Sequence, residues 1–225
     1  MTIYVILGLT LLFSFIVSSR LKSKFEKYSK TPLPFGLSGK EIAEKMLREN
    51  GIYDVRVTCV PGQLTDHYDP INKTVNLSTA VFEGHHISAA AVSAHECGHA
   101  IQHAESYSFL QMRSKLVPIV SFSSNIMQWV LLAGILLLNT FPSLLLIGIL
   151  MFAVTTLFSF ITLPVEINAS QRAVAWLSNT GIVSGQGEEQ AKDALKWAAY
   201  TYVIAALGSL ATLLYYISIF SGRRD

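Results

Sequence analysis

Four apolar stretches of membrane-spanning length dominate this sequence, and none of them carries a charged residue: residues 1–19, 116–138, 142–163 and 197–220. A helix needs about 20 apolar residues to cross the hydrocarbon core of a bilayer. With 51% hydrophobic and only 14% charged residues, the chain of 225 residues is also too apolar for an ordinary soluble domain. We therefore predict a mainly α membrane protein with about four transmembrane helices.

The basic residues give the expected orientation of these spans. Most of the Lys and Arg side chains lie between residues 20 and 115, and such residues stay on the cytoplasmic side of a membrane. The first stretch has no basic segment before it and no A-x-A cleavage signal after it, so we expect a retained anchor, not a signal peptide. Four crossings would leave Arg223 and Arg224 outside, but the longer basic loop outweighs this pair.

The polar segment of residues 90–104 contains the pattern H-E-x-x-H. Its alanines favour a helix, which would place His95 and His99 one turn apart on one face, with Glu96 beside them. In such sites two imidazoles hold one Zn²⁺ ion, and the carboxylate takes a proton from the zinc-bound water. Because a chance H-E-x-x-H also occurs in unrelated chains, a third ligand has to be found.

The two central spans restrict where that ligand can lie. Only residues 139–141 separate them, which predicts a tight transmembrane hairpin that returns the chain to the side it left. The first acidic residue after the hairpin is Glu166, in a helix that we expect to begin near Pro164. A solvated carboxylate at the membrane boundary is the alternative, but an unpaired charge is costly there. We favour Glu166 as the third ligand.

The region before the H-E-x-x-H segment predicts a small α+β unit. Ser38 and Glu41 are spaced to cap a helix that ends near Glu49, residues 52–60 alternate as a strand would, and residues 64–68 and 74–77 form a β-hairpin. A strand edge beside the metal, at residues 65–68 or 75–78, could hold the backbone of a substrate by β-augmentation. A plain structural hairpin is an equal alternative.

The motifs H-E-C-G-H-A-I-Q, T-D-H-Y-D-P and L-P-V-E-I-N-A-S-Q-R-A together resemble the YugP-type bacterial membrane zinc metallopeptidases, a family of neutral zinc metallopeptidases distantly related to the HtpX and CAAX prenyl-protease group. The resemblance covers nearly the whole chain. It implies a gluzincin-type site with His95, His99 and Glu166 as zinc ligands and Glu96 as the catalytic base. It also implies peptide or protein substrates, and suggests a role in membrane protein quality control.

Neighbours of the expected ligands are candidate second-layer or substrate-binding residues. Relatives often carry an Asp four residues after the third ligand, where it can orient a ligand histidine. This sequence has Ser170 at that position, and Ser170 or Asn168 could be a neutral substitute. His103, one turn beyond His99, could reach substrate, although a polar residue at a helix end is the commoner reading. We expect Arg172 to pair with a glutamate or a lipid phosphate.

These expectations define five segments: an anchor at 1–19, a cytoplasmic catalytic region at 20–115, a transmembrane hairpin at 116–163, a cytoplasmic segment with the third ligand at 164–196, and a last transmembrane helix at 197–220. The protein is expected to be a multi-pass enzyme of the bacterial inner membrane whose site faces the cytoplasm. The basic residues form no patch that would bind nucleic acid.

Two other functions are compatible with the motif. The first is a catalytically silent scaffold or chaperone whose zinc site is structural, with His103 or Cys97 closing the coordination. The second is a protease with its site inside the bilayer, but the polar residues of the H-E-x-x-H helix argue against a lipid-buried span. We expect Cys59 and Cys97 to be free thiols that do not bind the metal.

Overall fold

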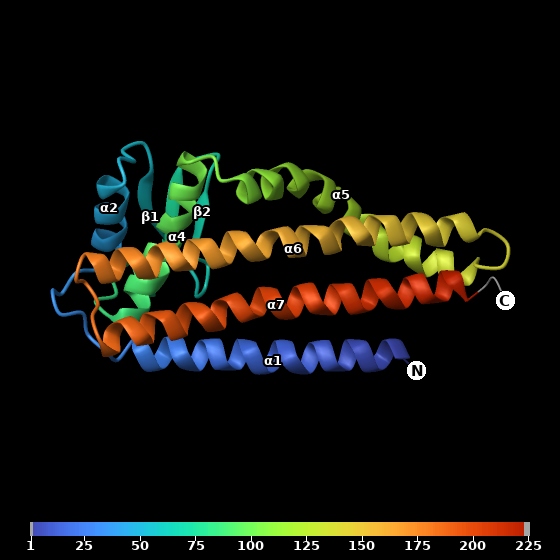
Figure 1. The fold of residues 1–225 in the computed structure, drawn as a ribbon, viewed down its shortest axis with the longest axis horizontal. Helices are drawn as coiled ribbons and strands as arrows, with labels where there is room; N and C mark the ends of the chain where they lie inside the picture. The colour runs from blue at the N-terminus through green and yellow to red at the C-terminus, as the bar shows by residue number, and fades with distance from the viewer. Residues whose placement is uncertain (1, 223–225) are drawn as a thin grey trace. The chain divides into compact units, whose positions relative to one another are not determined.

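The computed structural model describes residues 2–222, and Figure 1 follows them from the blue helix α1 to the red helix α7. The elements, in chain order, are α1 (Thr2–Tyr28), α2 (Gly39–Glu49), β1 (Arg56–Val60), β2 (His67–Asp69), β3 (Thr74–Ser78), α3 (Thr79–Phe82), α4 (Ile87–Ala104), α5 (Ser108–Leu136), α6 (Pro142–Asn179) and α7 (Gln186–Ser221). The long helices α1, α5, α6 and α7 are long and apolar enough to cross a membrane. The predicted mainly α membrane protein with a small β region is confirmed.

The chain forms two compact units, each assembled from separate stretches of sequence. The first comprises Met1–Ile16, Gln111–Leu163 and Thr201–Asp225, and within it α5 and α6 form a hairpin through residues 137–141 (Figure 1). The two helices of the hairpin approach closely at Gly134, where a Cβ atom would lie 2.6 Å from the Cα atom of Leu145. A small residue at this contact allows tight packing between apolar helices.

The second unit comprises Val17–Leu110 and Pro164–Tyr200, and it contains the sheet. The strand order is β1-β3-β2, with β1 parallel and β2 antiparallel to β3. Apolar side chains of the central strand, Val75 and Leu77, are fully buried together with Ile42 and Met46 of α2. The expected hairpin of β2 and β3 and the expected helix α2 are both present, and a reciprocal capping box starts α2.

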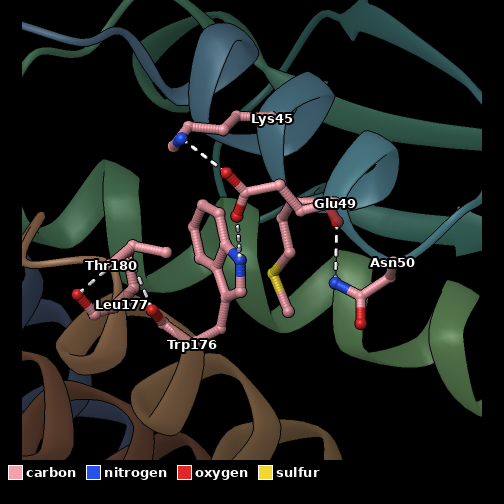
Figure 2. A network of polar contacts seen from close by, with 7 residues as sticks. Lys45, Glu49, Asn50, Trp176, Leu177 and Thr180 are labelled. Carbon is pink, nitrogen blue, oxygen red and sulfur yellow. Dashed lines mark hydrogen bonds and ion pairs between the residues drawn. The ribbon is translucent and has the colours of Figure 1, made fainter.

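The part of α6 that belongs to the second unit is fixed to α2 by a polar network (Figure 2). The Glu49 carboxylate accepts hydrogen bonds from Lys45 Nζ (2.6 Å) and from Trp176 Nε1 (2.9 Å). Chiefly because Lys45 donates to it, the pKa of Glu49 lies below its ordinary value. In the same unit, Lys24 of α1 pairs with Asp193 of α7 at 2.7 Å.

One expected boundary is wrong. Helix α6 does not begin near Pro164 but continues through it from Pro142 to Asn179. Proline lacks an N–H donor and removes one helical hydrogen bond, yet apolar helices tolerate it when neighbouring groups satisfy the freed carbonyl. The residues that follow the apolar stretch 142–163 therefore continue the same helix, and Glu166 lies on this continuation of α6.

Candidate metal centre

Helix α4 carries the two histidines of the H-E-x-x-H motif. It begins at Ile87, after His86, whose Nδ1 atom accepts a hydrogen bond from the backbone N–H of Ala89. One turn apart on this helix, the imidazole rings of His95 and His99 have centroids 4.8 Å apart and are nearly perpendicular. The helical spacing predicted from the sequence therefore places both rings side by side.

Helix α6 brings Glu166 to the same place. Its Oε2 atom lies 3.4 Å from Nε2 of His95 and 3.6 Å from Nε2 of His99. One possible ligand atom from each of the three residues lies within 4.8 Å of the others. Glu166 and His99 are buried, with 3% and 8% of their surface exposed. A carboxylate buried this deeply needs cationic or hydrogen-bonding partners, and the two imidazoles, or a metal ion held by this cluster, can be among them.

The spacing of the three donors fits zinc. Zinc binds histidine nitrogen and carboxylate oxygen at about 2.0–2.2 Å and prefers tetrahedral geometry, in which two ligand atoms stand about 3.4 Å apart. The Glu166 oxygen lies at 3.4 and 3.6 Å from the two imidazole nitrogens. Two neutral imidazoles and one carboxylate are also the ligand types found in catalytic zinc sites. The cluster could therefore hold the zinc ion that its chemistry suggests.

Burial and charge act on His99 in opposite directions. Burial alone would lower the pKa of His99, but the nearby carboxylates of Glu166 and Glu96 outweigh this and raise it above its ordinary value. Glu96 is itself buried, with 8% of its surface exposed, and lies between the two histidines in sequence. Its charge contributes to the raised pKa of His99, so the carboxylate acts electrostatically on the cluster.

The close approach of α4 and α6 depends on Gly98. A Cβ atom at this position would lie 2.8 Å from the carbonyl oxygen of Ala169 and 3.1 Å from its Cα atom. Both contacts are with backbone, which cannot rotate away as a flexible side chain would. The variable position of H-E-x-x-H just before His99 is therefore a packing contact that sets how near Glu166 comes to the histidines.

We expect Gly98→Ala to push the two helices apart. Overpacking of this kind costs about 1–3 kcal/mol, which corresponds to a fall in Tm of at least about 2 °C for a protein of this size. Thermal unfolding in detergent and a zinc titration would measure the loss of stability and of metal affinity together. A suitable control is Gly8→Ala, because Gly8 is also helical and has no atom within 4 Å of its would-be Cβ. A Gly98→Ala protein with unchanged Tm and zinc affinity would contradict the packing argument.

Each imidazole has a polar neighbour at its other nitrogen. Nδ1 of His95 lies 3.1 Å from the hydroxyl of Ser170, and Nδ1 of His99 lies 3.0 Å from Oε1 of Gln102. Ser170 thus contacts a histidine directly, whereas Asn168 contacts Gln102 instead. Gln102 was not among the residues predicted from the sequence, although a polar residue three positions after His99 lies on the same helical face and can be recognised by that spacing.

The other candidates do not join the cluster. His103 is exposed, and its Nδ1 atom lies 2.8 Å from the hydroxyl of Tyr68. Cys97 is free and fully buried, its thiol lies 3.5 Å from the carbonyl oxygen of Ala43, and burial raises its pKa. A thiol that stays protonated is a poor zinc ligand. Cys59 is also free.

The sheet narrows the choice of a strand for β-augmentation. Strand β3 is central and is paired on both sides, so the hypothesis that residues 75–78 receive a substrate backbone is wrong. Strand β2 is an edge strand among the described residues, and Tyr68 joins it to α4 through His103. Of the two expected segments, only residues 65–68 remain a candidate for pairing with a substrate backbone, because residues 67 and 68 belong to the edge strand β2.

Comparison with known proteins gives two matches that cover almost the whole chain. A family model described as "Putative neutral zinc metallopeptidase" matches residues 3–221. The "Putative membrane protease YugP" of Bacillus subtilis (strain 168) is 45% identical over 212 residues, which are 94% of this chain and 93% of that protein. No solved structure matches the chain. The family match spans His95, His99 and Glu166.

Proposed function

This chain belongs to the family of neutral zinc metallopeptidases, as its motifs predicted, and we propose that it is a membrane zinc endopeptidase of the H-E-x-x-H, gluzincin type. His95, His99 and Glu166 would hold the zinc ion, and Glu96 would be the catalytic base. The observation that carries the proposal is the approach of Glu166 Oε2 to both imidazole nitrogens at 3.4 and 3.6 Å. These distances match the edges of a tetrahedral zinc site.

The mechanism that we propose needs no protein nucleophile. Zinc, when bound, polarises the scissile carbonyl and lowers the pKa of a coordinated water from about 15.7 to about 7. Glu96 takes a proton from the attacking water and later delivers it to the amine that leaves. The buried surroundings of Glu96 and His99 exclude bulk water from this transfer, which strengthens the electrostatic interactions within the site.

We propose that an extended peptide binds along the open edge of β2. Backbone N–H and C=O groups at a sheet edge pair with an extended chain regardless of its sequence. The hydroxyl of Tyr68 and the ring of His103 hold this strand beside α4, the helix of the expected ligands. His103 would then contact substrate and not the metal.

Four apolar helices and the membrane protease relative support a membrane protein. We further propose that it lies in the bacterial inner membrane with the metal centre facing the cytoplasm, since the basic residues concentrate between residues 20 and 115. Membrane proteins are proposed as substrates, and quality control as the role, because Glu166 lies on α6, one of the helices long and apolar enough to span a membrane, and because the motifs resemble the HtpX group. We propose the same division into an anchor at 1–19, a catalytic region at 20–115, a transmembrane hairpin at 116–163, a cytoplasmic segment at 164–196 and a last transmembrane helix at 197–220.

A zinc-stabilised scaffold or chaperone without activity is the second candidate. It would need a closed site with four protein ligands, as structural zinc sites have. The buried thiol of Cys97 and the Tyr68-bound ring of His103 argue against either as the fourth ligand. His95, His99 and Glu166 would supply three ligands and leave one coordination position for water, which favours the enzyme.

Metal removal tests the proposal. The full chain, purified in detergent, is expected to contain one zinc ion per molecule and to cleave casein. A chelator should abolish cleavage, and one equivalent of added zinc should restore it. Zinc binding without any hydrolysis of casein or of a peptide library would reject the peptidase in favour of the scaffold. Hydrolysis that survives complete removal of the metal would reject the zinc mechanism.

A further inference from the structure

We propose that Gln102 is a positioning residue that fixes the proton of His99 on Nδ1 and so directs the lone pair of Nε2 toward the metal. This inference rests on the proposed function, because it takes His99 as a zinc ligand. Gln102 is fully buried and lies on α4, three residues after His99. Its Oε1 atom is 3.0 Å from Nδ1 of His99.

The orientation of the Gln102 amide follows from its other contacts. Its nitrogen, Nε2, lies 2.8 Å from the carbonyl oxygen of Val165 and 2.9 Å from Oδ1 of Asn168. A backbone carbonyl can only accept a hydrogen bond, so the amide NH₂ group has to face Val165. If the amide were flipped, two oxygens would face each other in a fully buried place. Oε1 of Gln102 is therefore obliged to face His99.

The side chain of Asn168 is oriented by the same logic. Its Oδ1 atom also accepts a hydrogen bond from Nε of Arg172, at 2.8 Å. A guanidinium group can only donate, so Asn168 presents oxygen and not nitrogen to Gln102. Arg172 in turn pairs with Glu105 at 2.7 Å, as expected from the sequence. Polar contacts of fixed direction thus connect Glu105, just after α4, with Arg172 and Asn168 of α6 and then with Gln102.

This chain of contacts determines the tautomer of His99. Because Oε1 of Gln102 is only an acceptor, Nδ1 of His99 has to carry a proton in order to bond with it. A neutral imidazole with its proton on Nδ1 has its lone pair on Nε2, the atom that faces Glu166 at 3.6 Å. His95 has no such constraint, since the hydroxyl of Ser170 can either donate or accept.

Gln102→Met would remove the amide while keeping the length and approximate volume of the side chain. The carbonyl of Val165 keeps its place within α6, and Asn168 keeps its bond from Arg172, so the group that loses its partner is Nδ1 of His99. We expect zinc affinity, measured by competition with a chromophoric chelator, to fall about 10- to 100-fold. Ser88→Ala is the matched control: Ser88 is also fully buried on α4, and its hydroxyl bonds to the Phe25 carbonyl, so zinc affinity should not change.

Nitrogen-15 NMR of histidine-labelled, zinc-loaded full chain reads the tautomer directly, with the His99 signals assigned from a His99→Asn spectrum. We expect an exchange-protected proton on Nδ1 of His99 in the wild type and loss of its protection in Gln102→Met. Zinc bound through Nδ1 of His99, or unchanged zinc affinity in Gln102→Met, would overturn the role of Gln102 alone. A wild-type chain that takes up no zinc would instead reject the proposed function and this inference with it. If Gln102→Met fails to fold, the wild-type spectrum alone still shows which nitrogen of His99 carries the proton and so tests the proposal.

Discussion

Glu96→Gln is expected to bind one zinc ion as tightly as the wild type and to cleave casein at least about 100-fold more slowly. A positioned general base contributes about 10²- to 10⁴-fold to such a reaction, and an amide cannot take the proton. The substitution keeps the shape of the side chain, and Glu96 is not among the three residues whose donor atoms face one another. This variant should therefore keep its zinc and lose its hydrolysis. A folding defect or a lost ligand would instead reduce both.

The measurement compares zinc per molecule with the initial rate of casein cleavage in the same detergent preparation. Glu83→Gln is a suitable control, because Glu83 is an exposed glutamate at the end of α3 and should leave both quantities unchanged. Cleavage by Glu96→Gln at a rate near that of the wild type would remove Glu96 from the mechanism. Loss of zinc in this variant would instead give Glu96 a role in holding the metal.

Features that depend on a few neighbouring residues were predictable from the sequence. Spacings within one element or one turn predict three such features. These are the capping box of Ser38 and Glu41, the hairpin of β2 and β3, and the adjacent rings of His95 and His99. The apolar stretches likewise gave the four long helices, because the length of an apolar run is a local property.

Features that depend on packing between distant segments were not predictable in the same way. Gly98 reads as a variable position of the motif, and its contact with Ala169 becomes visible only when α4 and α6 lie together. The place of β3 in the middle of the sheet depends on its parallel pairing with β1, which the local alternation of side chains does not encode. The tolerance of proline in the first turn of a helix predicts a helix start near Pro164, but the apolar helix α6 continues through this residue.

Glu166→Ala is expected to weaken zinc binding at least about 100-fold. Binding by a four-ligand zinc site is worth about 10–16 kcal/mol, so one ligand accounts for roughly 3 kcal/mol, and each 1.4 kcal/mol is a factor of ten. The backbone of α6 should persist, because alanine has the highest helix propensity. The loss would then come from the removed oxygen, which lies at 3.4 and 3.6 Å from the two imidazole nitrogens.

Two measurements test this expectation: a zinc titration, and the rise in Tm that saturating zinc produces. A ligand that binds only the folded state raises stability in proportion to the logarithm of its concentration over Kd, so the rise should be large in the wild type and nearly absent in Glu166→Ala. Glu188→Gln, at the start of α7 in the same unit, should behave as the wild type. Full zinc occupancy in Glu166→Ala would remove Glu166 from the ligand set and leave the transmembrane hairpin without a role in building the metal centre.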